Sequence, residues 1–145
     1  MTMKSPKLAA LFCTLALLVL PMSAYGASAG KPLTVCLLLD GTLGDRSFFD
    51  SANNGMKMVR EQLDNVKTTV VEMTYDDTKW EPALLDSIDE GYDIIITGTW
   101  QMTEIMARVA PQYPDQKFIL YDTSMDYSQP GYENVYSIEY KQSDG

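Results

Sequence analysis

Two aspartates, Asp40 and Asp122, stand directly after short apolar runs of the sequence. Asp40 follows LTVCLLL, and Asp122 follows KFILY. If both runs are strands lying close together in one parallel sheet, the two carboxylates share an edge, where they could act as acid and base or accept hydrogen bonds from a polar ligand. The chain has no histidine to activate a nucleophile. We therefore favour hydrogen-bond acceptors, with a turn-capping role for Asp40 as the alternative.

The segment around Asp40 matches only part of a known catalytic motif. Asp40-Gly41-Thr42-Leu43 matches the end of the motif of haloacid-dehalogenase-type phosphatases. Those enzymes need a nucleophilic aspartate two positions before the Asp-Gly-Thr, and Leu38, which cannot attack a phosphate, stands there. The segment is also no phosphate-binding loop, because no Gly-Lys-Ser/Thr follows it. These residues therefore argue against phosphoryl transfer.

Aromatic residues follow the expected strands as well. Phe48 and Phe49 open a helical pattern with Ser47 as its N-cap, and one ring can join the core while the other faces a cleft. The pattern does not distinguish the two rings, and a core role for both is the alternative. Trp100 comes after a short apolar run and Gly98-Thr99, so it walls a pocket unless the segment is an ordinary turn. A ring at the mouth of a cleft suits stacking on a planar ligand.

Charge and composition exclude several classes of protein. The 145 residues allow one domain, and 20 acidic against 11 basic side chains give a net charge of -9, which disfavours binding to a nucleic-acid polymer. Without histidine the chain lacks every zinc site that needs imidazole. The two cysteines make no disulfide framework, and Cys36 is expected as a buried free thiol. We expect no metal, no cofactor and no enzymatic activity.

Residues 1–29 are predicted to be a signal peptide. Lys4 and Lys7 precede the apolar run Leu8–Leu20, and Ala27-Ser28-Ala29 fits the A-x-A cleavage pattern. The 13 apolar residues are fewer than the ~20 that span a bilayer. Cys13 lies inside the run rather than after a small residue at the cleavage site, so no direct membrane anchor is evident. The expected location is periplasmic or secreted, after removal of this segment.

The remaining residues alternate between strand and helix patterns. Continuous apolar runs are typical of strands covered on both faces, and apolar residues at helical spacing separate them. This alternation predicts an α/β fold with a parallel sheet flanked by helices, whose ligands bind beyond the carboxyl ends of the strands. The expected strands are 33–39, 66–73, 93–97, 117–121 and 134–138, and the expected helices are 47–64, 81–90 and 101–110.

Four segments, spread over nearly all of residues 33–145, together resemble the basic membrane protein (BMP) family. This family comprises substrate-binding proteins of ABC transporters and includes purine-nucleoside-binding lipoproteins. The resemblance implies a periplasmic-binding-protein-like (type I) fold, of which residues 30–145 form the N-terminal lobe. The second lobe is expected to lie outside this sequence. The segments are DGTLGDRSFFDSANNG (40–55), GYDII (91–95), YPDQKF (113–118) leading to Asp122, and NV (134–135) leading to YKQ (140–142).

The resemblance also implies a function and a set of ligand-binding residues. The chain would capture a small polar ligand, with a nucleoside as the expected one, in a cleft between two lobes and deliver it to the permease of an ABC importer. Two alternatives stay open: a small secreted hydrolase that uses Asp40 and Asp122, and a ligand-sensing lobe that signals to a membrane receptor. Matched to the family motif, the ligand-binding residues are Asp40, Ser47, Phe48, Trp100 and Asp122.

Overall fold

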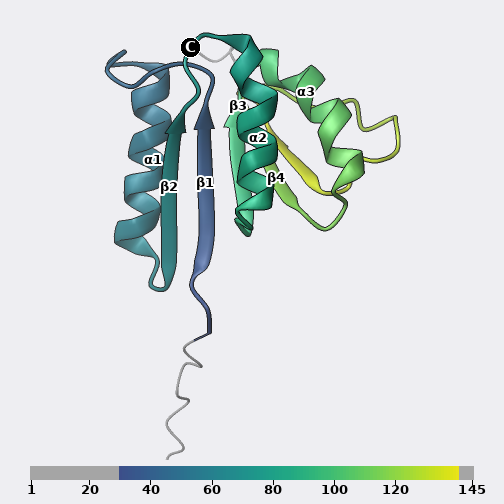
Figure 1. The fold of residues 1–145 in the computed structure, drawn as a ribbon. Coiled ribbons are helices and arrows are strands. Elements are labelled where there is room, and N and C mark those ends of the chain that lie inside the picture. The colour runs from purple at the N-terminus through teal and green to yellow at the C-terminus, as the bar shows by residue number, and fades with distance from the viewer. Residues whose placement is uncertain (1–29, 141–145) are drawn as a thin grey trace, which may run out of the picture.

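The computed structural model describes residues 30–140, which form a five-stranded sheet with helices on both faces (Figure 1). The strands lie in the order β2-β1-β3-β4-β5, and every neighbouring pair is parallel. The predicted α/β class with a parallel sheet is therefore confirmed. In chain order the elements are β1 (Leu33–Leu39), α1 (Phe48–Gln62), β2 (Val66–Glu72), α2 (Trp80–Asp89), β3 (Ile94–Gly98), α3 (Gln101–Val109), β4 (Lys117–Tyr121) and β5 (Val135–Ile138).

Strand β1 lies inside the sheet between β2 and β3. It pairs with β2 from Leu33 opposite Val66, and with β3 from Val35 opposite Ile94. Its side chains from Val35 onward are buried on both faces, as its continuous apolar sequence predicts. The carboxyl end of β1, where Asp40 follows, is therefore surrounded by other elements of the fold.

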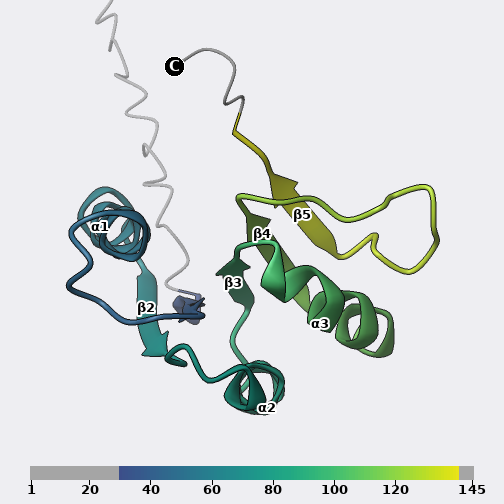
Figure 2. The same cartoon turned by 90° about the horizontal axis from the view of Figure 1, so that it is seen from above.

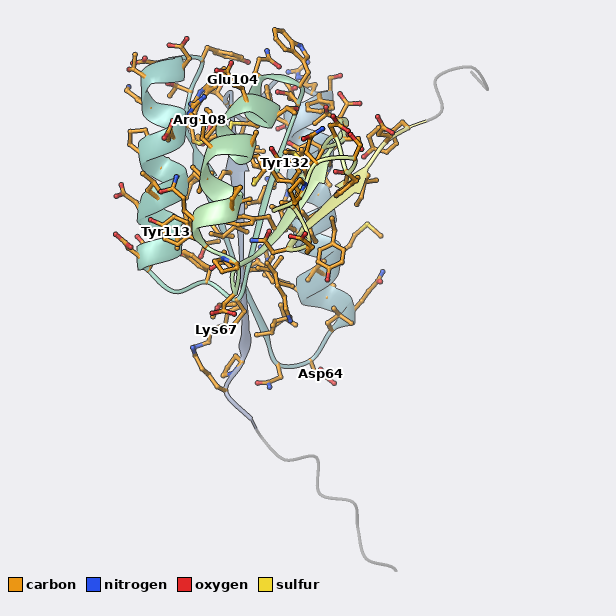
Figure 3. All side chains as sticks on the ribbon, turned by 90° about the vertical axis from the view of Figure 1, so that its right-hand side faces the viewer. Asp64, Lys67, Glu104, Arg108, Tyr113 and Tyr132 are labelled. Atoms are coloured by element: carbon orange, nitrogen blue, oxygen red, sulfur yellow. The ribbon has the colours of Figure 1, made fainter. Side chains whose placement is uncertain are left out.

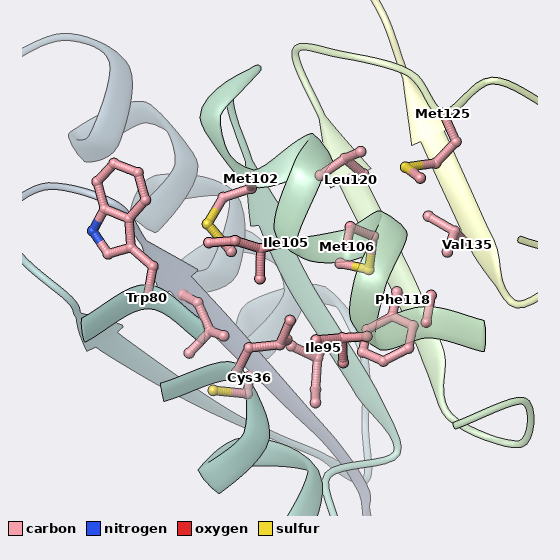
Figure 4. Packing of buried hydrophobic residues seen from close by; sticks show 14 of the residues in the cluster. Cys36, Trp80, Ile95, Met102, Ile105, Met106, Phe118, Leu120, Met125 and Val135 are labelled. Carbon is pink, nitrogen blue, oxygen red and sulfur yellow. The ribbon is translucent and has the colours of Figure 1, made fainter. Parts of the chain in front are cut away.

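Helices α2 and α3 cover one face of the sheet (Figure 2). The core on this face includes Leu38 and Ile95 from the strands and Leu84 and Met106 from the helices, all fully buried. Figure 4 shows Ile95 and Met106 within this core. Cys36 lies in the same core as a free thiol, and burial raises its pKa to about 11. This thiol is protonated at neutral pH, which agrees with the expected structural role.

The surface of these two helices carries a small charged cluster. Arg108 on α3 contacts Glu104 at 3.0 Å on the same helix and Glu81 at 2.6 Å on α2. Glu104 and Arg108 are seen on the outer face of α3 in Figure 3. All three side chains are exposed to solvent, so the pairs add little stability and mainly fix how the two helices lie.

Helix α1 packs on the opposite face, beside β1 and β2 (Figure 2). Phe49 and Met56 of the helix are buried against Leu37 and Leu39 of β1. The helix does not extend over β4 and β5, where Ile119 and Ile138 line an open groove. One face of the sheet is thus fully covered by helices, and the other only in part.

The predicted ends of the elements agree with the structure to within two residues, but one local prediction is wrong. Ser47 stands before α1, yet its side chain makes no capping hydrogen bond. The carboxylate of Asp45 does this instead, accepting hydrogen bonds from the N–H groups of Ser47, Phe49 and Asp50. An aspartate has two acceptor oxygens, so it can satisfy several free N–H groups at once.

The predicted signal peptide, residues 1–29, lies outside the described residues. Across residues 30–140, the helices are too short or too polar to pass through a bilayer.

Candidate functional site

The order of the strands marks one place on the sheet as a natural binding site. The chain runs from β1 to β2 on one side of β1 and then crosses to β3 on its other side, so the strand order reverses between β1 and β3. Ligands of open α/β sheets bind in the crevice beyond the carboxyl ends at such a reversal. Asp40 follows β1 and Thr99 follows β3, so these two residues flank this point.

Asp40 is a buried carboxylate with one partner and one free oxygen. Its side chain is 3 % exposed, and its Oδ2 atom accepts a hydrogen bond of 2.5 Å from the hydroxyl of Thr99. Its Oδ1 atom is buried and has no hydrogen-bond partner. Burial raises the pKa of Asp40 above its usual value, and the hydrogen bond from Thr99 partly opposes this effect. A buried oxygen without a partner is costly in the free protein, and a ligand that donates a hydrogen bond removes that cost.

The backbone at Thr99 adopts a conformation that β-branched residues rarely take. Its φ is +69°, in the left-handed region. Its N–H donates to the carbonyl of Tyr121 at 3.1 Å, which ties the end of β3 to the end of β4. This conformation goes together with the hydrogen bond from the Thr99 hydroxyl to Asp40. Strained backbone that persists in a fold clusters at functional sites, and this residue fits that pattern.

Tyr121, the last residue of β4, lies next to these two residues. Its ring packs directly over Gly98, where an added Cβ would lie 2.4 Å from ring carbons. Tyr121 is 7 % exposed, and its hydroxyl is buried without a hydrogen-bond partner. Burial, and then the charge of Asp40, raise the pKa of this phenol above its usual value. The hydroxyl is therefore a neutral donor and acceptor at neutral pH.

Phe48 and Phe49 take different positions at the start of α1. Phe49 is buried, and its ring lies against Gly41, where an added Cβ would be 2.2 Å away. Phe48 is half-buried, and its ring centre lies 5.5 Å from that of Tyr121. The structure thus places Phe49 in the core and leaves Phe48 to line the groove beside α1. The ligand-stacking role of Phe48 stays a prediction.

The loop between β1 and α1 is held in place by three carboxylates. Asp45 accepts from the start of α1, as described above. Asp50 accepts hydrogen bonds of 2.8 Å from the N–H groups of Gly44 and Arg46. Glu72, at the end of β2, accepts one of 2.7 Å from Leu43. These contacts fix the loop that carries Phe48 above the carboxyl end of β1.

A groove of about 780 Å³ runs between α1 and the uncovered face of the sheet. Its floor is apolar and includes Leu37, Ile96 and Ile119 from three neighbouring strands. The groove ends at the carboxyl edge of the sheet, where the residues that line it are more polar. The polar residues are Ser47, Tyr121, Asp122 and Tyr140, and the ring of Phe48 lies among them.

The structure does not gather all the predicted site residues. Ser47, Phe48 and Asp122 share the groove end, and Asp40 is buried at the switch point between β1 and β3. Strand β3 lies between β1 and β4, so the strands that end in Asp40 and Asp122 are not adjacent. The condition stated from the sequence, that the two strands lie close together, is met only across one intervening strand. Strand order depends on long-range pairing, which local sequence patterns do not record.

Trp100 lies apart from the groove. Its side chain is 75 % exposed, and it borders a separate depression of about 400 Å³ with Gln101, Glu104 and Arg108.

The backbone of Asp122 resembles that of Thr99, because its φ is also positive, at +61°. Each residue directly follows its strand, so positive φ angles occur after the neighbouring strands β3 and β4.

Sequence reasoning missed two residues of this site, Thr99 and Tyr121. Thr99 belongs to the Gly98-Thr99-Trp100 segment, in which only the tryptophan was expected to line a site. Tyr121 is indistinguishable from a core aromatic in the strand KFILY, although a tyrosine needs a partner for its hydroxyl when buried.

In residues 30–140, no group of three or more His, Cys, Asp or Glu side chains is arranged to hold a metal ion.

Comparisons with known proteins show which family this chain is similar to. The family model described as "ABC transporter substrate-binding protein PnrA-like" matches residues 33–145. Basic membrane protein A of Borreliella burgdorferi is 30 % identical over 103 residues, which are 71 % of this chain and 30 % of that protein. An uncharacterized lipoprotein of Pyrococcus horikoshii is 33 % identical over 104 residues, or 70 % of this chain and 25 % of that protein.

A solved structure agrees with these sequence matches. The crystal structure of an ABC transporter solute-binding protein from Aeropyrum pernix K1 has a TM-score of 0.64 and 32 % identity to this chain. The match covers 73 % of this chain and 28 % of the solved one. The chain therefore spans less than a third of each of these three relatives.

Proposed function

Because the chain belongs to the family of PnrA-like ABC transporter substrate-binding proteins, we propose that it contributes to capturing a nucleoside for an ABC importer. The family supports binding of a solute. The nucleoside, the permease as partner and a periplasmic or secreted location are our inferences. One of the matched relatives is a lipoprotein, which supports a location outside the cytoplasm.

The observation that carries the proposal is the free oxygen of Asp40. This atom is a buried hydrogen-bond acceptor at the reversal of the strand order, and the half-buried ring of Phe48 lies at the start of α1, the helix that follows Asp40 in the chain. A nucleoside offers both matching features, because its hydroxyl and amino groups donate hydrogen bonds and its base presents a flat face. The apolar groove beside Phe48 provides room for such a ring system.

Binding fits these residues better than hydrolysis. The two carboxylates of the hydrolase alternative end strands that β3 separates, and Asp40 is bound to a threonine hydroxyl rather than to a nucleophile or base. A general acid and a general base must both reach the reacting group. We therefore propose that the site holds its ligand unchanged.

Calorimetric titration with a panel of nucleosides tests the proposal. We expect adenosine, guanosine, inosine, cytidine or uridine to give a saturable signal, and glucose and leucine to give none. Phe48→Ala should weaken the signal, whereas Tyr136→Ala, which removes an exposed ring on β5, should leave it unchanged. Saturation by glucose or leucine alone, or turnover of p-nitrophenyl phosphate, would overturn the proposal.

A further inference from the structure

Two buried oxygen atoms at the site have no partner. They are Oδ1 of Asp40 and the hydroxyl oxygen of Tyr121. Both side chains are more than nine-tenths buried, at 3 % and 7 % exposed. Buried polar groups are nearly always hydrogen-bonded in folded proteins, so two unpartnered ones at the same site call for an explanation.

A continuous set of contacts brings the two groups together. The ring of Tyr121 lies flat over Gly98, and the next residue, Thr99, binds the other oxygen of Asp40. The carbonyl of Tyr121 accepts the N–H of Thr99, so the ends of β3 and β4 are held in register at this point. The electrostatic effect of Asp40 on the phenol, described above, agrees with this proximity.

Phe48 packs on Tyr121 at the end of the groove. Its ring lies on that of Tyr121, with centres 5.5 Å apart and planes inclined by 31°. Phe48 is half-buried at the groove end, whereas Phe49 beside it is locked against Gly41. A ligand at this end of the groove contacts both Phe48 and Tyr121, because both line it.

We propose that Tyr121 and Asp40 form a subsite that binds one hydroxyl group of the ligand. The carboxylate accepts the proton of that hydroxyl, and the phenol of Tyr121 donates its own proton to the hydroxyl oxygen. A hydroxyl group satisfies both atoms at once because it donates and accepts. A ligand carboxylate or phosphate would meet the charge of Asp40, and an apolar group would leave both oxygens unpaired. This inference rests on the proposed function, since the ligand enters the same cleft.

The subsite makes Tyr121 a specificity-determining residue. A site built to hydrogen-bond a hydroxyl rejects analogues that lack it, because its buried polar groups are then left unpaired. A nucleoside would therefore be preferred over its free base through this pair. The base itself would be recognised by stacking, which depends on Phe48 and not on the Tyr121 hydroxyl.

The test compares Tyr121→Phe with the parent protein and with Tyr136→Phe, which removes a hydroxyl from the exposed ring on β5. Nuclear magnetic resonance titrations of the whole chain, which detect weak binding, use adenosine, adenine, uridine, uracil and D-ribose as probes. We expect Tyr121→Phe to bind the better nucleoside about tenfold more weakly, the size of one good hydrogen bond. Its affinity for the free base and its melting temperature should not fall, and Tyr136→Phe should match the parent throughout.

The outcomes separate the subsite from the proposed function. Equal nucleoside affinity in Tyr121→Phe and the parent overturns the subsite and leaves nucleoside binding in place. A lower melting temperature, or an equal loss for nucleoside and free base, also overturns it, because the hydroxyl would then act structurally. Ribose binding that depends on Tyr121, without nucleoside binding, supports the subsite and contradicts the proposed function. Absence of binding by all five probes overturns both.

Discussion

The hydroxyl of Thr99 donates a hydrogen bond of 2.5 Å to Asp40 from a backbone with φ at +69°. The threonine thus adopts an unfavourable conformation at the position from which it holds a buried carboxylate. A glycine at this position would avoid the strain but would provide no hydroxyl. The contact occupies one oxygen of Asp40 and leaves the other buried without a partner.

Replacing Thr99 with valine should destabilise the chain. The substitution leaves both oxygens of Asp40 without a partner, which costs about 1–3 kcal/mol in the free energy of unfolding. Thr99→Ser keeps the hydroxyl and should unfold close to the parent. Urea denaturation at pH 7 measures both variants. Equal stability of the valine and serine variants would mean that the hydrogen bond contributes nothing.

Replacing Asp40 with asparagine should change how stability depends on pH. Burial raises the pKa of Asp40 above its usual value of 3.8, so the folded state binds more protons than the unfolded state just above pH 3.8. The contribution of Asp40 to stability therefore falls as the pH rises through that window and stays low above it. Asp40→Asn lacks this effect and should gain stability relative to the parent between pH 3 and pH 7.

The same variant should bind nucleosides less well, because an amide N–H₂ group replaces one acceptor oxygen. Denaturation curves at several pH values and one calorimetric titration at pH 7 measure both effects. If the parent gains stability relative to Asp40→Asn as the pH rises, the pKa of Asp40 is lowered rather than raised.

The two phenylalanines of α1 should respond differently to truncation. Phe49→Ala empties a buried site against Gly41 and should cost about 3–5 kcal/mol of stability. Phe48→Ala should weaken nucleoside binding by about 1–3 kcal/mol, the range for base–aromatic stacking, with a smaller effect on stability. Denaturation and calorimetry on each variant separate the two quantities. The reverse pattern would show that the ring roles are exchanged.

Removing the Asp45 carboxylate should destabilise α1 only where the carboxylate is ionised. Hydrogen bonds from the N–H groups of Ser47 and Phe49 lower the pKa of Asp45 below its usual value of 3.8. Its contribution is therefore present above pH 3.8 and is lost as the pH falls through the lowered value. Asp45→Ala should be less stable than the parent at pH 7, and this difference should shrink as the pH falls below 3.8. The exposed Asp64, in the turn after α1, provides the control Asp64→Ala.

Gly98→Ala should force the ring of Tyr121 to move. The added Cβ would lie 2.4 Å from ring carbons, and overpacking of this kind costs about 1–3 kcal/mol. Gly55→Ala is the matched control, because a Cβ there meets no atom within 4 Å and alanine favours the helix by about 0.5–1 kcal/mol. In Tyr121→Ala the cost of Gly98→Ala should shrink. A full cost in the double variant would place the clash elsewhere.

The sequence predicts where the helices and strands lie along the chain better than it predicts which strands lie next to one another in the sheet. LTVCLLL and KFILY are strands because continuous apolar runs fit only a sheet buried on both faces, and this information is local. The insertion of β3 between β1 and β4 comes from pairing over long sequence distances, so the relation between Asp40 and Asp122 was not visible. The same limit hid the contact between Thr99 and Asp40, which lie 59 positions apart.

Local chemistry was also misjudged at one point. Ser47 and Asp45 both suit the start of a helix, and only the path of the loop decides that Asp45 turns its carboxylate toward α1. Tyr121 could be placed in a strand by pattern, whereas the lack of a partner for its hydroxyl is a property of the packed structure.

The apolar groove beside α1 affects which fluorescence signal can report the thermal unfolding of this chain. Environment-sensitive dyes fluoresce on exposed apolar surface, and the folded chain already offers them Ile96 and Ile119. A dye-based melting curve would start at a high signal and mask the transition. The indole rings offer a better reporter. Trp80 is 8 % exposed and changes its surroundings on unfolding, whereas Trp100, at 75 %, stays close to water in both states, so the shift in emission follows the core around α2.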